Sequence, residues 1–290
     1  MTTGRPPAAE RPGVGRETRR RGREGSAWWV YLAVAAFAAL IAGIFLSVLF
    51  NSFAATWFGG WLPDAYTTKW YRFALAEFDL ARVLGVTIVV GVAVTLASLL
   101  LGLPAAYVLA RRTFPGKNIV LMTLILPMLV PPITYGIPLA AMLYRLHLGG
   151  SLAGVILINI VPALPFVVLI MTPFFEQIDP NLERAARMLG ARLFRIFTRV
   201  LLPLVLPGML AAGLLILVRT IALFELTFLI SGARSQTLVV ALYYAAFAAG
   251  IRPSQSIDAM AVVYMVTSLV LLLTALRFIN PVNMVIRVKR

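Results

Sequence analysis

The chain has 290 residues, of which 61% are hydrophobic and 13% are charged, and its formal net charge is +15. Soluble domains carry about a quarter charged residues, so this composition excludes an ordinary water-soluble globular protein. The sequence has no cysteine and one histidine, which excludes disulfide bonds and thiolate metal sites and leaves no ligand set for a metal ion. The basic residues lie in tails and in short loops between apolar runs, a pattern typical of membrane orientation and not of a nucleic-acid interface.

The first part of the chain, residues 1–26, is rich in proline, glycine and arginine and has almost no large apolar side chain. It cannot bury a core, so we expect a disordered basic tail. The apolar run at 28–50 is longer than the core of a secretory signal peptide and has no clear small-residue cleavage site. We therefore interpret it as an uncleaved membrane helix, with a cleaved signal peptide as the alternative.

The segment 27–80 combines this helix with an external stretch, 51–80, that is rich in tryptophan and tyrosine. Amphipathic rings settle at membrane–water interfaces, so anchoring is a simpler interpretation than ligand binding. The aromatic residues of this stretch that suit an interface are Trp57, Trp61, Tyr66, Trp70 and Tyr71.

A helix needs about 20 apolar residues to cross the hydrocarbon core of a bilayer. Six runs meet this length, so the predicted fold is an all-α polytopic membrane protein with six transmembrane helices. Its core is expected over 81–280, followed by a short tail at 281–290. Because lysine and arginine concentrate on one set of loops, we expect a multi-pass protein of the cell inner (plasma) membrane with both termini cytoplasmic. The six runs lie at 28–50, 81–110, 118–143, 152–172, 204–231 and 257–279.

Prolines interrupt the third and fourth runs. Proline removes a helix hydrogen bond, and a lipid-facing helix cannot leave backbone groups unpaired. Broken spans near the bilayer midplane often line transport sites, and kinked packing is an equally good alternative. The prolines are Pro127, Pro131, Pro132 and Pro138 in the third run, and Pro162 and Pro165 in the fourth.

Two charged residues, Arg219 and Glu225, lie inside the fifth run. A charge at the membrane centre costs on the order of 2.5–3.5 kcal/mol, so each is expected to face protein or water. On one continuous helix they would point about 120° apart and would not pair. Together with Tyr135 and Asn159 they are candidates for a solute pathway, and the alternative is a salt bridge or hydrogen-bond network at a subunit interface.

The loop between the fourth and fifth runs holds a charged segment with strong helix signals. Asp179 is a good N-cap before Pro180, and Gly190 suits the left-handed position that ends a helix. A second helix is expected to resume near Leu193 and to pass into the fifth run, with Pro203 and Pro207 at its bend. Taken alone, these signals favour an amphipathic helix that lies on lipid headgroups.

The spacing of small residues in this loop resembles the cytoplasmic signature of ABC-importer permeases. That signature reads Glu-Ala-Ala, three residues, Gly, nine residues, Ile, one residue, Leu-Pro. Here Ala185 and Ala186 are followed by three residues and Gly190, and nine further residues precede Val-Leu-Leu-Pro at 200–203.

The match departs from the family pattern at two positions. Arg184 replaces the glutamate directly before the alanine pair, with Glu183 one position earlier, and Val200 replaces isoleucine. The resemblance extends over about 70–279 and includes the end of the second run, Ala-Ala-Tyr-Val-Leu-Ala-Arg-Arg.

The resemblance implies a binding-protein-dependent type I (MetI-like) importer permease with a cytoplasmic coupling helix between spans four and five. Two permease subunits, identical or different, would form the pore, a cytoplasmic ATPase dimer would dock on the coupling helices, and an extracytoplasmic binding protein would deliver the solute. The sequence has no Gly-x-x-x-x-Gly-Lys-Ser/Thr phosphate loop, so we expect no catalytic residue and no cofactor here, and ATP and magnesium would bind to the partner ATPase. The residues implied for ATPase coupling are Leu182, Glu183, Ala185, Ala186, Leu189, Gly190 and Pro203.

The solute that the resemblance suggests is a polyamine-like cation, because Leu189 precedes the signature glycine and Thr-Thr-Lys-Trp-Tyr at 67–71 precedes the second run. Ferric iron, phosphonates, opines and sugars are open alternatives. A secondary transporter driven by an ion gradient is a different class of alternative. It would need several intramembrane carboxylates, and we count Glu225 alone. A non-transporting membrane scaffold is a third.

Overall fold

The structure of the chain is a computed structural model, and it confirms the all-α class. It describes residues 27–57, 60, 62–247 and 253–278. This part consists of helices and one isolated bridge, between Ala54 and Tyr66. Five of the described helices are long and apolar enough to cross a membrane, and one bent helix pair makes a sixth span if it is counted as one. The tails predicted at 1–26 and 281–290 lie outside the described residues.

The span predicted at 28–50 is the helix α1 (Ala27–Phe53), and its stretch up to Ser47 belongs to a compact unit of its own. Its mean hydropathy reaches 2.7. The side chains from 28 to 47 are all exposed, so this stretch buries no face within its unit. An apolar helix of this kind suits contact with lipid.

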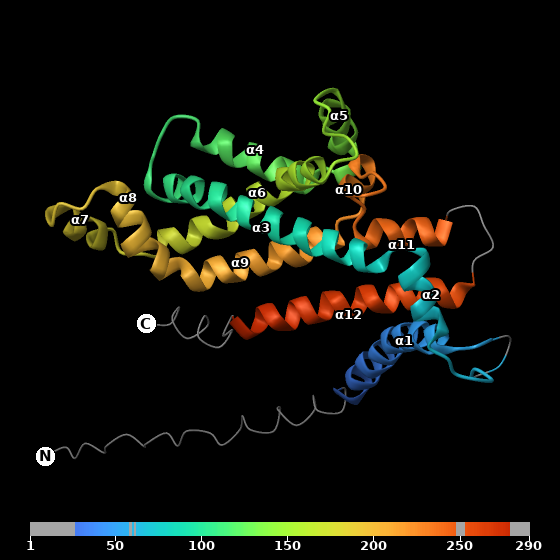
Figure 1. Cartoon of the computed structure of the whole chain (residues 1–290). Helices are drawn as coiled ribbons and strands as arrows, with labels where there is room; N and C mark the ends of the chain where they lie inside the picture. Colours follow the sequence, from blue (N-terminus) through green and yellow to red (C-terminus); the bar gives the residue numbers. More distant parts are fainter. Residues whose placement is uncertain (1–26, 58–59, 61, 248–252, 279–290) are drawn as a thin grey trace, which may run out of the picture. The chain divides into compact units, whose positions relative to one another are not determined.

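Three long helices form the centre of the second unit. α3 (Leu80–Arg111), α6 (Leu152–Glu176) and α9 (Leu202–Ala222) pack against one another and lie side by side in Figure 1. A Cβ atom added at Gly102 of α3 would lie 2.7 Å from the Cγ1 atom of Val167 in α6, so the glycine is needed for this close approach. Small residues at such contacts let membrane helices gain van der Waals packing. The buried side chains shared by these helices include Val94, Ala106, Ile158, Val168, Ala212 and Ile216.

The third predicted span is two helices, α4 (Lys117–Leu129) and α5 (Pro132–Arg145), which are bent by 100° relative to each other. Pro131 has no N–H, and a residue before proline is pushed out of the helical region. Val130 accordingly takes an extended conformation (φ −86°, ψ 135°), and Pro132 starts the next helix. The predicted interruption of this run is confirmed, and it is a sharp break and not a kink.

The prediction of one helix over 204–231 is wrong. α9 ends at Ala222, Leu223 is extended (φ −77°, ψ 102°), and a separate short helix, α10 (Glu225–Ile230), follows. The sequence has no glycine or proline at this break. Packing decides it, because α10 contacts both α5 and α6 and buries Leu226 completely.

The same span begins earlier than predicted. α8 (Leu193–Ile196) and a π-helical turn, η2 (Phe197–Leu201), lead directly into α9. The N–H of Leu202 donates to the carbonyl of Phe197, five residues back. Pro203 lacks an N–H and would crowd the carbonyl four residues before it in a regular α-helix, so the wider turn accommodates the ring. The predicted restart near 193 is confirmed. Pro203 follows the π-helical turn and Pro207 lies inside α9, and the expected bend at these prolines stays a prediction.

Three further helices complete the unit: α2 (Lys69–Glu77), α11 (Leu238–Phe247) and α12 (Ser254–Phe278). α12 packs on α2 and α9, and α11 packs on α12 and α3. The hydroxyl of Thr87 accepts a hydrogen bond from the backbone N–H of Leu238 at 2.8 Å, which fixes the start of α11 on α3. The sequence analysis did not expect α11, which at ten residues is too short to span a bilayer.

Two aromatic residues of the 51–80 segment close it through hydrogen bonds. Trp70 Nε1 donates to the carbonyl of Ala54 at 2.6 Å, and the hydroxyls of Tyr71 and Ser52 share a bond at 2.8 Å. These bonds hold α2 against the end of α1 within the second unit. Interfacial anchoring by this segment stays a prediction.

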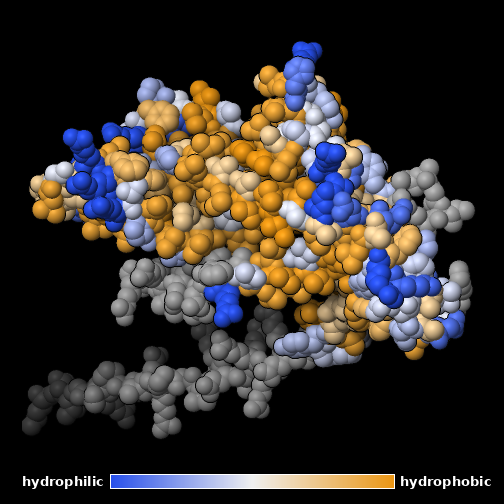
Figure 2. Space-filling view, viewed as in Figure 1, coloured by the Kyte–Doolittle hydropathy of each residue, from blue (hydrophilic) through white to orange (hydrophobic). Residues whose placement is uncertain are grey.

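The described surface of the second unit is apolar over its middle. Figure 2 shows hydrophobic residues over α3, α6 and α9, and hydrophilic residues toward the end that carries α7 (Pro180–Met188) and toward the end that carries α5 and α2. This distribution suits a bundle whose two ends reach water and whose middle meets lipid.

Candidate functional site

The loop helix predicted after Asp179 is α7, and its first turn has the predicted cap. The carboxylate of Asp179 accepts a hydrogen bond from the backbone N–H of Asn181 at 2.9 Å. Pro180 occupies the first helical position, where a missing N–H is no loss. The sequence therefore located the start of α7 correctly.

The end of α7 is fixed by Gly190, which has a φ of +78°. Its N–H donates to the carbonyl of Arg187 at 2.9 Å, and the N–H of Ala191 donates to the carbonyl of Ala186 at 3.0 Å. These two bonds form a Schellman motif, which requires a left-handed residue at the position of the glycine. The predicted helix stop is confirmed.

The side chains of α7 divide between an inner and an outer side. Glu183 is only 5% exposed, and Ala186 packs against the hydrophobic core. Ala185 is exposed, so the two alanines of the signature do not share a surface. We call the outward residues of this region the outer apolar surface. It consists of Leu182, Ala185 and Met188 of α7, Leu189 at its C-cap, and Phe194 of α8.

Glu183 attaches α7 to the end of α3. One carboxylate oxygen accepts from Arg111 Nε at 2.7 Å, and the other accepts from the hydroxyl of Tyr107 at 2.8 Å. Arg111 also donates to the carbonyl of Ile178 at 2.7 Å, just before α7 begins. The Glu183 and Arg111 side chains are 7% and 12% exposed, so this ion pair is largely shielded from solvent. We call these three side chains, Tyr107, Arg111 and Glu183, the anchor.

Aromatic packing extends the anchor to two more elements. The Tyr107 ring contacts the rings of Phe175 in α6 and Phe197 in η2 edge-on, at centroid distances of 5.8 and 5.7 Å. Phe175 and Phe197 stack on each other at 6.1 Å. The helix that carries the signature is therefore held to α3, α6 and the π-helical turn at a single place.

The sequence analysis placed Glu183 among residues that would touch a partner, whereas its carboxylate is used inside the chain. Arg184, at the position of the family's glutamate, is exposed and donates to the Asn181 side chain at 3.1 Å. Sequence reasoning assigned Arg111 to membrane orientation and did not single out Tyr107. The charges of Arg111 and Glu183 were visible in the sequence, but nothing in the sequence around either residue indicates that the two form an ion pair.

The four candidate pathway residues lie on four helices: Tyr135 on α5, Asn159 on α6, Arg219 on α9 and Glu225 on α10. Because α9 and α10 are separate helices, the expected angle between Arg219 and Glu225 along one helix does not apply. The Tyr135 hydroxyl is buried and has no hydrogen-bond partner among the described residues. Asn159 and Arg219 line the same pocket. The broken helices thus bring polar residues from distant positions into one region.

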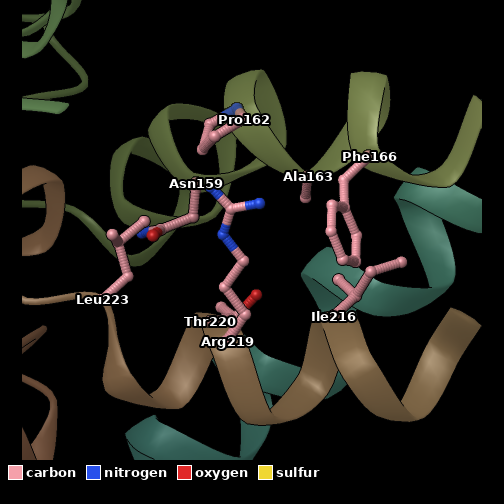
Figure 3. Close-up of a pocket in the computed structure, with 8 residues that line it drawn as sticks. All are labelled: Asn159, Pro162, Ala163, Phe166, Ile216, Arg219, Thr220 and Leu223. Atoms are coloured by element: carbon pink, nitrogen blue, oxygen red, sulfur yellow. The ribbon is translucent and has the colours of Figure 1, made fainter. Parts of the chain in front are cut away.

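A pocket lies between α6 and the end of α9. The pocket is small and partly open to solvent. In Figure 3 the Arg219 side chain rises from α9 toward α6, and its guanidinium lies between Asn159 and Phe166. The guanidinium carbon is 5.1 Å from the centre of the Phe166 ring, a cation–π distance. The lining residues are Asn159, Pro162, Ala163, Phe166, Ile216, Arg219, Thr220 and Leu223.

Asn159 is the most buried polar residue of this pocket, at 1% exposure. Its Nδ2 donates to the Val155 carbonyl at 2.8 Å and to the Thr227 hydroxyl at 3.0 Å. Its Oδ1 has no hydrogen-bond partner. Glu225 is not among the residues that line the pocket. Phe166 and Thr227 were not predicted, because nothing in the sequence around them indicates a site. Asp258 in α12 is a further half-buried carboxylate, not predicted from the sequence, and it accepts a hydrogen bond from Asn51.

Residues 98–282 match the protein family described as binding-protein-dependent transport system inner membrane component. The chain belongs to this family. The matched range includes α7, η2 and every residue that lines the pocket. The family identified from the signature spacing is therefore confirmed.

Individual relatives agree with this membership. The chain is 37% identical over 170 residues to the molybdenum transport system permease protein of Haemophilus influenzae, covering 53% of this chain and 74% of that protein. It is 32% identical over 160 residues to the trehalose transport system permease protein of Mycobacterium tuberculosis, covering 55% and 58%. Across such curated relatives, the chain spans between half and three quarters of their length.

The fold also matches a solved structure. A chain of a bacterial ABC transporter involved in the import of the acidic polysaccharide alginate aligns with a TM-score of 0.74 at 18% identity. The alignment covers 89% of this chain and 98% of that one, so the two chains share a fold.

Proposed function

We propose that this chain is a permease subunit of an ABC importer, which forms half of a solute pathway and couples it to a cytoplasmic ATPase. The observation that carries the proposal is the outer apolar surface on α7 and α8. Met188, Leu189 and Phe194 are 83%, 89% and 80% exposed, although they sit at the hydrophilic end of the bundle. Large apolar side chains exposed together at a polar end mark an interaction site.

The anchor supplies a route for motion. A partner bound to the outer apolar surface would displace α7 when it moves. Because Glu183 on α7 binds Arg111, the displacement would reach the end of α3. Since α3 packs against both α6 and α9, a displacement of α7 would reach the helices that line the pocket. This is a mechanical route from the ATPase to the pathway, with no chemistry performed by the chain itself.

The partners follow from this role. ATP and magnesium would bind to the ATPase dimer, a second permease subunit, identical or different, would complete the pore, and an extracytoplasmic binding protein would deliver the solute. The tails and α7 would then be cytoplasmic. Arg111 and the α7 loop, which the lysine and arginine distribution assigned to one side, lie at the same end of the bundle and support this orientation.

The polyamine expectation finds little support. Leu189 is on the outer apolar surface, and of the 67–71 segment Trp70 and Tyr71 close the external stretch, so these residues do not line the pocket. The relatives described above are named for molybdenum and trehalose. The motifs that suggested the solute therefore sit away from any site that could select it.

The proposed docking is tested by Leu189→Glu, with the matched exposed residue Leu146→Glu at the opposite end as the control. Both variants are purified through a tag on this chain from cells that also express its ATPase. We expect Leu189→Glu to lose at least 90% of the co-purifying ATPase, whereas Leu146→Glu keeps it. A charge cannot enter an apolar socket without a large desolvation cost. Equal ATPase recovery from both variants would refute the proposed docking surface.

A further inference from the structure

The pocket between α6 and α9 contains a guanidinium, that of Arg219, for which the described residues supply no ion-pair partner. Among the described residues, ion pairs join Arg82 with Asp79 and both Arg111 and Arg187 with Glu183, and none includes Arg219. A guanidinium within a membrane segment is expensive unless an anion or a polar group compensates it. Glu225 lies on the next helix, but its carboxylate is not within 4.0 Å of the Arg219 nitrogens.

The position of the guanidinium is set by its neighbours. Phe166 lies under it at 5.1 Å, and the other lining residues are mostly apolar. A guanidinium is planar and carries its N–H groups in a rigid fork, which suits bidentate binding of an oxyanion. The apolar lining lowers the local dielectric and strengthens such an interaction.

A second, independent observation points to a ligand. Asn159 is 1% exposed, lines the same pocket, and leaves Oδ1 without a donor. The assignment of its amide is fixed, because Nδ2 donates to the Val155 carbonyl. Unsatisfied buried acceptors are rare and need an explanation. A ligand with a hydroxyl or an N–H beside its anionic group would satisfy Asn159 and Arg219 together.

We propose that this pocket is a transit site for the oxyanion group of the solute, bound by Arg219 and oriented by a donor to Asn159. The solute class is therefore a small anion, either a hydroxy- or amino-carboxylate or an inorganic oxyanion that brings a protonated oxygen or a bound water. A polyamine is excluded from the pocket, because its ammonium would meet the guanidinium at close range. This inference rests on the proposed function, since a transit site has meaning in a permease.

The test measures binding to the whole transporter, purified in detergent with its ATPase through a tag on this chain. Isothermal titration is performed with three probes: sodium gluconate for hydroxy-carboxylates, sodium molybdate for inorganic oxyanions, and spermidine for polyamines. We expect one of the two anions to bind and spermidine not to bind. Which anion binds decides between the two sources of the oxyanion.

Two variants at the pocket and one control complete the test. Arg219→Gln is expected to weaken anion binding at least tenfold, and Arg219→Lys, which keeps the charge but loses the fork, is expected to fall between it and the wild type. Arg145→Gln, an arginine that does not line the pocket, is expected to bind as the wild type does.

The outcomes separate this inference from the proposed function. If the ATPase co-purifies but neither anion binds, or if Arg219→Gln binds the anion as the wild type does, the inference is overturned and the permease role stands. If Arg219→Gln instead separates the two permease subunits while anion binding persists, Arg219 belongs to a subunit interface and the inference is also overturned. Should Arg219→Gln fail to fold, Arg219→Lys carries the same comparison. Absence of any ATPase from the wild-type preparation would refute the proposed function.

Discussion

The anchor makes a quantitative prediction for the variant Glu183→Gln, which keeps the shape of the side chain and removes its charge. Breaking one partner of a buried ion pair costs about 3–5 kcal/mol, because the other charge is left uncompensated. The carboxamide retains one hydrogen bond, worth about 1 kcal/mol. Since Glu183 and Arg111 are 7% and 12% exposed, little of this cost is screened by solvent. We therefore expect the attachment of α7 to weaken by about 2–4 kcal/mol.

Hydrogen exchange of the α7 amides reports this loss directly. Each 1.4 kcal/mol corresponds to a tenfold change in the opening equilibrium, so exchange across 183–190 should accelerate by about 30-fold to several hundred-fold. Exchange in the middle of α6 should stay unchanged, because the anchor residues belong to α3 and α7 and do not hold that part of α6. The same variant should still bind the ATPase, because the outer apolar surface is unchanged. It should lose ATP-driven uptake, because the attachment of α7 to α3 is lost.

The matched control is Arg184→Gln, one residue along the same helix. Its guanidinium is exposed and contacts Asn181 at 3.1 Å, so the change should alter stability by no more than about 0.5 kcal/mol. In a double-mutant cycle with Arg111→Gln, the second substitution should cost far less when Glu183 is already neutral. If Glu183→Gln exchanges within threefold of the wild type, the anchor does not hold α7 and the proposed mechanical route fails.

Two further predictions concern glycines. Gly190→Ala should destabilise the end of α7 by about 1–2 kcal/mol. The added methyl meets open space, so the cost comes from backbone strain at a φ of +78°. Hydrogen exchange at 186–191 measures this loss, and unchanged exchange would contradict the Schellman assignment. Gly102→Val should abolish stable protein, because its Cβ would lie 2.7 Å from Val167, while Gly85→Val, in open space on the same helix, should still purify as a monodisperse protein. Equal yields of both would contradict the tight α3–α6 contact.

Local backbone chemistry made the ends of α7 predictable from the sequence. The carboxylate of Asp179 and the left-handed Gly190 act on groups within four residues of themselves, so their effect is written in the local sequence. The break between α4 and α5 was expected for the same reason, since Pro131 acts on its own backbone and on its neighbour. Hydropathy likewise determined the apolar runs, because the bilayer requires length and composition and not particular partners.

Tertiary structure alone decided which residues meet. The helix break at Leu223 has no local signal and follows from the packing of α10. Glu183 faces inward because it binds Arg111, which lies 72 positions earlier at the end of α3. Arg219 and Asn159 share a pocket because α6 and α9 pack together. Contacts between distant segments depend on the arrangement of whole helices, and a single sequence records the helices but not which of their side chains come to face one another.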